Sequence, residues 1–239
     1  MKIIGISSGK GGVGKSTVAV NLSCALAARG LGVGLIDADF YGPSVPILLG
    51  EASLELNNEN KIIPAFKYGV KFVSIQFFLP NPDEPVIWRG PMITKALEQL
   101  LRDVDWTGVD YLLIDMPPGT GDIQISLSQQ SQIAGVILVT TPQKVAFSDV
   151  RKARRMFEKV RVPFLGYVAN MVNSERFSIF GNLDYELINK EDILIEIPLN
   201  PEIAKMSDEG KPPVLFNVAP QFFELADRVI EKLENLEHS

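Results

Sequence analysis

A run rich in glycine and lysine around residue 10 carries the clearest chemistry in the sequence. The residues Gly9-Lys10-Gly11-Gly12-Val13-Gly14-Lys15-Ser16-Thr17 match the phosphate-binding pattern G-x-x-x-x-G-K-[ST] in full. Glycines let backbone N–H groups curl around phosphate oxygens without clashes from Cβ atoms. Lys15 can reach the β- and γ-phosphates of a nucleotide, and the Ser16 hydroxyl can join the coordination shell of Mg²⁺. We therefore predict that this loop binds a nucleotide through its phosphates.

The segments on either side of the loop have the patterns that such a loop requires. The apolar stretch Ile3-Ile4-Gly5-Ile6 precedes it and is typical of a buried strand. Residues Ser16–Arg29 follow with helical character, so the positive end of that helix dipole would point at the same anion. This strand–loop–helix order makes a chance glycine-rich turn a poor alternative.

Carboxylates end two further apolar runs. Asp37 and Asp39 end the run Leu35-Ile36-Asp37-Ala38-Asp39, and Asp115 ends the run Tyr111-Leu112-Leu113-Ile114-Asp115. Because alternate side chains of a strand point the same way, Asp37 and Asp39 can both face the phosphates. Like charges beside a triphosphate are tolerable only near Mg²⁺ and lysines. Asp115 has the place of a Walker B aspartate, which usually reaches Mg²⁺ through a water; the alternative for the pair at 37 and 39 is a solvated strand end.

Two later positions could complete a nucleotide site. The segment Pro117-Pro118-Gly119-Thr120-Gly121 follows Asp115, and the Gly119 N–H can approach a γ-phosphate and sense its presence. Asn170 follows the apolar run Phe164–Ala169, and its amide offers a donor and an acceptor that suit the N6/N7 edge of adenine. The alternative for Asn170 is a turn or helix-cap residue.

Strand-like and helix-like patterns alternate along the chain, which predicts a doubly wound α/β fold with a mostly parallel sheet and helices on both faces. We expect one P-loop domain over residues 1–239, with the ligand at the carboxyl ends of the strands. The polar stretch Glu51–Tyr68 is interpreted as an exposed excursion. The expected strands are Ile3–Ser7, Val33–Asp37, Val70–Ile75, Tyr111–Asp115, Gly135–Thr140, Phe164–Ala169 and Ile193–Ile197. The expected helices are Ser16–Arg29, Pro91–Val104, Ser148–Val160 and Pro220–Leu236.

Composition narrows the classes of function. The chain has 239 residues, of which 46% are hydrophobic and 22% charged, as in a large soluble α/β domain. Its net charge of −6 argues against nucleic acid as the main partner. A single cysteine excludes a disulfide framework and fits the reducing cytoplasm. No apolar run has the roughly 20 residues of a membrane span, and since the first strand begins near residue 3 we expect no signal peptide.

Taken together, these motifs resemble the deviant P-loop ATPases, a group that includes the nitrogenase iron protein and the arsenite-pump, septum-positioning and plasmid-partition ATPases. The resemblance implies ATP as the nucleotide, with Mg²⁺, and a homodimer in which Lys10 reaches the nucleotide of the other subunit. It also implies that Asp39 orients or activates the attacking water while Asp37 supports the metal region. Asn170 would contact adenine, and Pro198 begins a segment similar to the loop that closes over the base.

Several segments look like the Mrp branch of this group, the ATPases that carry iron–sulfur clusters. The resemblance covers nearly the whole chain and implies binding of a [4Fe–4S] cluster and its transfer to apoprotein clients. The segments that carry it are Asp37-Ala38-Asp39-Phe40-Tyr41-Gly42-Pro43-Ser44, Trp88-Arg89-Gly90-Pro91-Met92, Ile114–Asp122, Thr140-Thr141-Pro142-Gln143 and Ile197–Glu202.

One feature departs from that branch. Its members usually carry C-x-x-C shortly after the adenine asparagine, where two subunits share the cluster. Here the residues Asn170–Gly181 contain no cysteine, and the segment looks several residues shorter than the family pattern. Cys24, the only cysteine, falls in the helix after the phosphate loop, where core packing is its expected role. His238, the only histidine, is expected to be solvated.

Three classes of function follow from these observations. The first is a dimeric Mg²⁺-ATPase that carries iron–sulfur clusters, with cluster binding implied only by resemblance. The second is an ATP-driven regulatory or chaperone-like switch without a cluster. The third is a positioning ATPase on membrane or DNA. Acidic residues on the outer face of the helix Pro220–Leu236 argue against its membrane form, because anionic lipids would repel them.

Overall fold

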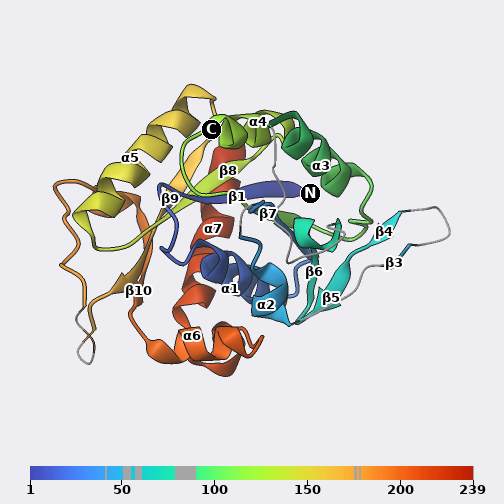
Figure 1. Ribbon diagram of the computed structural model, residues 1–239. Helices are drawn as coiled ribbons and strands as arrows, with labels where there is room; N and C mark the ends of the chain where they lie inside the picture. The colour runs from blue at the N-terminus through green and yellow to red at the C-terminus, as the bar shows by residue number, and fades with distance from the viewer. Residues whose placement is uncertain are drawn as a thin grey trace.

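The computed structural model describes residues 1–40, 42–50, 55–56, 61–78, 90–174, 177 and 179–238. Its centre is an 8-stranded sheet with the strand order β10-β9-β8-β1-β7-β2-β6-β5 (Figure 1). The strands of this sheet are β1 (Lys2–Ser8), β2 (Val33–Asp37), β5 (Ala65–Lys67), β6 (Val70–Ser74), β7 (Tyr111–Asp115), β8 (Gly135–Thr140), β9 (Phe164–Val172) and β10 (Ile193–Pro198). All neighbouring strands pair in parallel except β5 and β6, which are antiparallel.

Helices connect the parallel strands and cover the sheet. They are α1 (Lys15–Ala28), α2 (Val45–Leu49), α3 (Gly90–Arg102), α4 (Asp122–Gln130), α5 (Lys144–Lys159), α6 (Pro201–Asp208) and α7 (Gln221–Glu237). Short 3₁₀ turns lie at Ile75–Phe78, Lys190–Asp192 and Pro213–Phe216, and a small hairpin pairs β3 (Glu55–Leu56) with β4 (Ile62–Ile63). Within the described residues, no helix combines the length and the apolar character needed to cross a bilayer.

Each face of the sheet buries its own apolar core. On one face, side chains of α1 and α7 such as Leu22 and Phe222 pack on the sheet. On the other face, α3 and α5 contribute side chains such as Leu97 and Phe147. Because alternate residues of a parallel strand point to opposite faces, strands buried on both sides read as continuous apolar runs. This arrangement confirms the predicted α/β fold with helices on both faces.

The strand order brings the sequence motifs to one edge of the sheet. β1 lies between β7 and β8, and β2 lies on the far side of β7. The loops that follow β1, β2 and β7 therefore leave neighbouring strands at their carboxyl ends. The carboxyl edge of a parallel sheet, at the point where the strand order changes direction, is the usual ligand position in open α/β folds.

Three features differ from the expected elements. α5 begins at Lys144 instead of Ser148, because the buried side chains of Ala146 and Phe147 extend its packed face by one turn. Within the stretch expected to be an exposed excursion, β5 joins the main sheet and Ala65 is buried. The short helices α2, α4 and α6 lack enough turns to give a clear sequence period. The segment Trp88-Arg89 and Tyr41 lie outside the described residues.

Candidate active site

The phosphate loop joins the end of β1 to the start of α1. Gly14 is the N-cap of α1 with φ of 84°, a left-handed conformation that favours glycine. Gly9 lies directly against the backbone of Asp149 and Val150 in α5, where a Cβ atom would clash. Both glycines are therefore required by the backbone path of the loop, one by conformation and the other by close packing.

Lys15 lies among carboxylates at the centre of the site. Its Nζ is 2.6 Å from Asp115 Oδ1 and 3.4 Å from Asp39 Oδ2, and it also donates to Ser16 Oγ at 3.3 Å. Burial by itself would lower the pKa of Lys15, but the charges of Asp115 and Asp39 outweigh it, so the pKa of Lys15 lies above its usual value. Lys15 is thus held as a cation at the position where a phosphate would bind.

Asp115 has a free coordinating atom. Its side chain is fully buried, and its Oδ2 has no hydrogen-bond partner among the described residues. Burial raises the pKa of this carboxyl group, while the charge of Lys15 opposes the shift. An unpaired buried carboxylate oxygen is costly unless a ligand satisfies it. Asp115 and the neighbouring Ser16 hydroxyl therefore fit a Mg²⁺ ion that takes its other ligands from phosphates and waters.

Asp37 has a different environment, since backbone and hydroxyl donors occupy its carboxylate. Its Oδ2 accepts hydrogen bonds from Ser44 N and Val45 N, each at 3.0 Å, and from Ser74 Oγ at 3.1 Å. Complete burial and the charge of Asp115 raise the pKa of Asp37 to about 7. These contacts fix the turn after β2 and the start of α2. The sequence indicated a carboxylate near the metal but gave no sign of this supporting function.

Asp39 lies at the open side of the cluster. Its side chain retains 12% exposure, whereas that of Asp115 retains none. Its backbone N–H donates to Asp37 Oδ1 at 3.3 Å, so the fully buried Asp37 helps to orient Asp39, which keeps slight contact with solvent. A carboxylate that is held beside Lys15 yet reachable by water can contact a nucleophile. This position is compatible with the prediction that Asp39 orients or activates the attacking water.

Gly119 lies in the loop after β7 with φ of 102°, and its N–H donates to Ser8 O at 2.9 Å. Its amide therefore contacts the end of β1 in this structure. Gln124 in α4 donates to Pro117 O at 3.1 Å and to Pro118 O at 2.8 Å, and these two hydrogen bonds hold the same loop against α4. No sequence motif predicts this function of Gln124, because its partners are backbone carbonyl groups.

Asn170 and Pro198 lie near the other end of the loop. The Asn170 side chain is buried and donates through Nδ2 to Val13 O at 2.8 Å, so it holds the phosphate loop in place. Pro198 ends β10 beside Val172. Asn170 therefore contacts the phosphate loop, while Pro198 lies at the end of the neighbouring strand. The contacts of both residues with an adenine base stay predictions.

Lys10 lies at the rim of the loop and points to α5. Its Nζ donates to the side-chain oxygen of Gln143 at 2.7 Å. Gln143 is the N-cap of α5 and lies 133 positions from Lys10, so no local sequence pattern links the two residues. In this chain, Lys10 is thus bound to its own subunit through one side-chain hydrogen bond.

The donor set does not fit an iron–sulfur cluster. Cys24 is buried in the core, and burial raises the pKa of its thiol to about 12, which disfavours the thiolate that binds iron. Within the described ranges, no group of three or more His, Cys, Asp or Glu side chains could hold a metal ion alone. The described residues between 171 and 187 are exposed or half-buried, and the sequence has no cysteine there.

Comparison with known proteins places this geometry in a family. The family model described as ParA, the NUBPL iron-transfer P-loop NTPases, matches residues 1–234. An iron–sulfur cluster carrier protein of Aquifex aeolicus is 45% identical over 248 residues, covering 98% of this chain and 68% of that protein. An Arabidopsis thaliana protein named as an iron–sulfur protein required for NADH dehydrogenase, mitochondrial, is 44% identical and covers 98% of this chain and 79% of its own length. The Aquifex alignment is longer than the 239 residues of the chain, so that relative has residues within the aligned region that this chain lacks.

Solved structures agree with the sequence comparison. A nucleotide-binding protein from Archaeoglobus fulgidus in complex with ADP has a TM-score of 0.76 and 36% identity, covering 88% of this chain and 87% of its own. The cell division ATPase MinD of Pyrococcus furiosus has a TM-score of 0.73 and 28% identity, covering 97% of this chain and 99% of its own. The chain therefore belongs to the Mrp/NUBPL family of iron–sulfur cluster carrier P-loop NTPases, with a MinD/ParA-like fold.

Proposed function

We propose that this protein is a Mg²⁺-dependent ATPase that works in the delivery of iron–sulfur clusters to apoproteins. The observation that carries the proposal is the buried contact of Lys15 with Asp115, whose second oxygen has no partner among the described residues. An ion pair that leaves one carboxylate oxygen free is suited to receive a phosphate and a metal together. The family of the chain supplies the connection with iron–sulfur delivery.

The residues of the site have distinct tasks in this proposal. Lys15 and the loop amides bind the β- and γ-phosphates. Ser16 and Asp115 would hold Mg²⁺, which would supply neutralisation of charge on the phosphates. Asp39 orients a water molecule in line with the bond between the γ-phosphorus and the oxygen bridging to the β-phosphate. Attack by this water breaks that bond and yields ADP and phosphate, and the water proton leaves toward Asp39 or a phosphate oxygen. The Asp37 carboxylate keeps Asp39 in place by accepting a hydrogen bond from the Asp39 backbone N–H.

The proposed active form is a homodimer closed around ATP. Lys10 would leave Gln143 and contact the phosphates of the opposite subunit. The contact broken is a single hydrogen bond from a charged, half-buried lysine, whose net contribution is about 1.5 kcal/mol, so the several negative charges of a second triphosphate can outcompete it. Mixing Lys10→Ala with Asp39→Ala subunits tests this step. Rates that equal the sum of the separate variants would exclude contact between the two active sites.

A cluster bound by a cysteine pair is not part of the proposal, since the chain lacks the thiolates. The cluster is cargo, and the donor protein or the client protein must supply most of the ligands to its irons. The burial of Cys24, the only cysteine of the sequence, also favours a second function. The protein would then be an ATP-driven switch that docks a client protein and holds no cluster at any stage.

One experiment separates these functions. The purified protein is mixed anaerobically with a [4Fe–4S] donor and an apoprotein whose activity needs the cluster, with and without Mg-ATP. The proposal predicts faster client activation with ATP, and no acceleration with Lys15→Ala. If wild-type protein hydrolyses ATP yet never accelerates activation, the switch without cargo is the better account. Absence of hydrolysis would contradict both.

A further inference from the structure

A groove along the outer side of α5 concentrates positive charge on an otherwise acidic protein. Two adjoining cavities, of about 220 Å³ and about 360 Å³, share Arg151, Arg155 and Leu187 in their walls. Lys144 and Lys152 also line the larger one, whose wall contains no carboxylate. The whole chain has a net charge of −6, so this concentration of cations is local. We call this feature the α5 groove.

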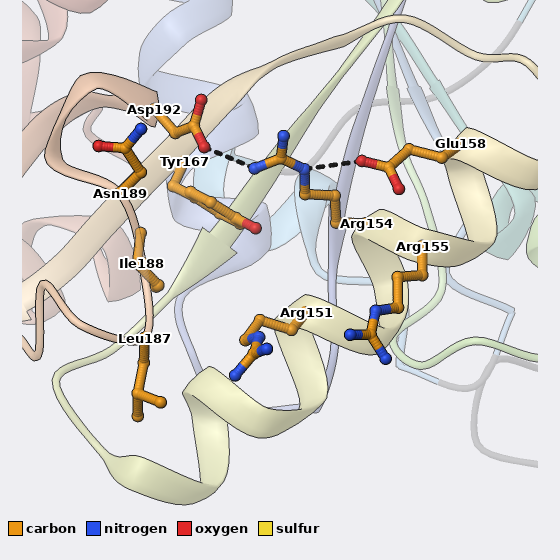
Figure 2. Close-up of a pocket in the computed structure, with 9 residues that line it drawn as sticks. All are labelled: Arg151, Arg154, Arg155, Glu158, Tyr167, Leu187, Ile188, Asn189 and Asp192. Atoms are coloured by element: carbon orange, nitrogen blue, oxygen red, sulfur yellow. Dashed lines mark hydrogen bonds and ion pairs between the residues drawn. The ribbon is translucent and has the colours of Figure 1, made fainter.

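An ion-pair network fixes the groove in shape. Arg154 donates to Asp192 at 2.5 Å and to Glu158 at 2.9 Å, which ties α5 to the turn at 190–192 (Figure 2). The guanidinium of Arg154 also lies 4.4 Å from the centre of the Phe164 ring. Both acidic residues in the wall are therefore satisfied by Arg154. The groove is preorganised. Lys152 pairs with Asp149 at 3.1 Å, and within the described residues the cations of the groove without an ion pair are Lys144, Arg151 and Arg155.

Arg151 and Arg155 are the unsatisfied cations. They lie one helical turn apart on the exposed side of α5. Within the described residues, neither arginine side chain forms an ion pair or a hydrogen bond. Figure 2 shows both side chains extending from α5 away from the Arg154 anchor, with Leu187 across the groove. Two unpaired guanidinium groups opposite an apolar side chain favour a ligand that offers both carboxylates and an apolar contact.

The length of the charged stripe indicates a chain-like ligand. Lys144 and Arg155 are eleven residues apart on one helix, which corresponds to about 16 Å at 1.5 Å per residue. A single phosphate or carboxylate could contact only one part of this stripe. An extended or helical peptide with several acidic residues could contact all of it.

Other polyanions fit less well. Nucleic-acid sites combine a basic domain with aromatic stacking platforms, whereas this chain has a sequence pI of about 5.0 and the one aromatic residue in the walls, Tyr167, is buried. Membrane-surface helices insert an apolar face into lipid. The apolar face of α5, including Phe147 and Phe157, is already buried in the core.

We propose that the α5 groove binds an acidic segment of a partner protein, with carboxylates on Arg151 and Arg155 and an apolar side chain on Leu187. That this partner is a client of cluster delivery rests on the proposed function. The position of the groove also links it to the nucleotide. Gln143, which accepts a hydrogen bond from Lys10, is the N-cap of α5, and the backbone of α5 packs on Gly9 of the phosphate loop.

Fluorescence anisotropy with a labelled synthetic peptide, rich in glutamate with a central leucine, tests the proposal. The wild-type protein should bind the peptide with an affinity that falls as salt rises. Arg151→Glu with Arg155→Glu should weaken binding at least about tenfold, because reversal turns attraction into repulsion. The matched control, Lys95→Glu with Lys232→Glu, makes the same change in net charge at exposed lysines on α3 and α7 and should bind like the wild type.

The possible outcomes are distinct. Equal binding by both double variants, or no binding by the wild type, would overturn the proposal. Preferential binding of a single-stranded DNA of equal charge, or of vesicles of phosphatidylcholine and phosphatidylserine, would also overturn it and assign the groove to that polyanion. ATP hydrolysis is measured on the same samples and should be unchanged by the α5 reversal. Peptide binding without hydrolysis would contradict only the proposed function, and hydrolysis without peptide binding only the groove.

Discussion

The phosphate loop and the segment after β9 are neighbours in space but differ in construction. The loop is fixed by buried polar contacts, including Lys15 with Asp115 and Asn170 with Val13. Beyond Asn170, none of the described residues from 171 to 187 is buried, and Phe177 and Ile179 are exposed apolar side chains. The difference indicates that buried polar contacts fix the proposed nucleotide site, whereas the described residues from 171 to 187 have no comparable buried network.

The largest effect is expected at the centre of the loop. Lys15→Ala removes the cation that faces Asp115 and Asp39, leaving carboxylates that repel a triphosphate. ATP affinity should fall at least about a hundredfold, equivalent to about 2.7 kcal/mol. Isothermal titration calorimetry in Mg²⁺ measures this. Lys232→Ala on the exposed side of α7 is the control, and near-normal ATP binding by Lys15→Ala would remove the basis of the site.

Asp39→Ala should separate binding from turnover. Because Asp39 is placed at the open side of the cluster, its loss should lower kcat by about a hundredfold, within the range of general-base contributions. ATP affinity should change by less than about threefold. Asp39→Asn refines the result, since an amide can still orient water but cannot accept its proton. Wild-type turnover by Asp39→Ala would show that another group handles the water.

How far the sequence could predict this site depends on how many positions separate the two residues of each contact along the chain. Gly9–Thr17 is a local motif, and its strand and helix are adjacent in sequence, so its position could be predicted in full. The contact of Lys10 with Gln143 joins residues 133 positions apart and depends on the strand order. The acceptance by Asp37 of a hydrogen bond from Ser74 likewise appears only when β2 and β6 pair, whereas its contacts with Ser44 and Val45 depend on the path of the turn after β2. The α5 groove needs the turn at 190–192 to fold against α5, which no local pattern specifies.

A smaller effect is expected for Cys24, where core packing is the only predicted function. Cys24→Ser buries a hydroxyl group and should lower the free energy of unfolding by about 1–3 kcal/mol, while the matched Cys24→Ala should cost less. Urea denaturation measures both. Unchanged stability in Cys24→Ser would mean that the residue is not a packed core side chain.

The thiol of Cys24 also has a predictable pH dependence. Its pKa rises from an ordinary 9.0 to about 12 in the folded chain, so folding favours the protonated thiol. Above about pH 9 the unfolded chain ionises first, and stability should therefore fall as pH rises. At pH 8 a thiol reagent should react slowly with the native protein and rapidly in denaturant. Rapid native reaction would identify an accessible thiolate and reopen the question of a metal ligand.

The smallest effect concerns Gln143. Gln143→Ala releases Lys10 from its contact within the subunit, which is worth about 1.5 kcal/mol for a charged donor at a half-buried position. ATP-dependent dimerisation should become up to about tenfold more favourable, as measured by sedimentation with a non-hydrolysable ATP analogue. Lys10→Ala should remove the gain when combined with Gln143→Ala. Weaker dimerisation in the single variant would show that Gln143 supports the interface directly.

The content of iron and sulfide after anaerobic reconstitution tests most directly the comparison between the phosphate loop and the segment after β9. The protein is incubated with ferrous iron, sulfide and a reductant, separated from unbound metal, and assayed beside Cys24→Ser. We predict active Mg²⁺-dependent ATP hydrolysis with no stoichiometric cluster in either protein, because no thiolate pair is available. About four irons and four sulfides per dimer, retained in Cys24→Ser, would contradict this account, since the chain would then ligate a [4Fe–4S] cluster without cysteine.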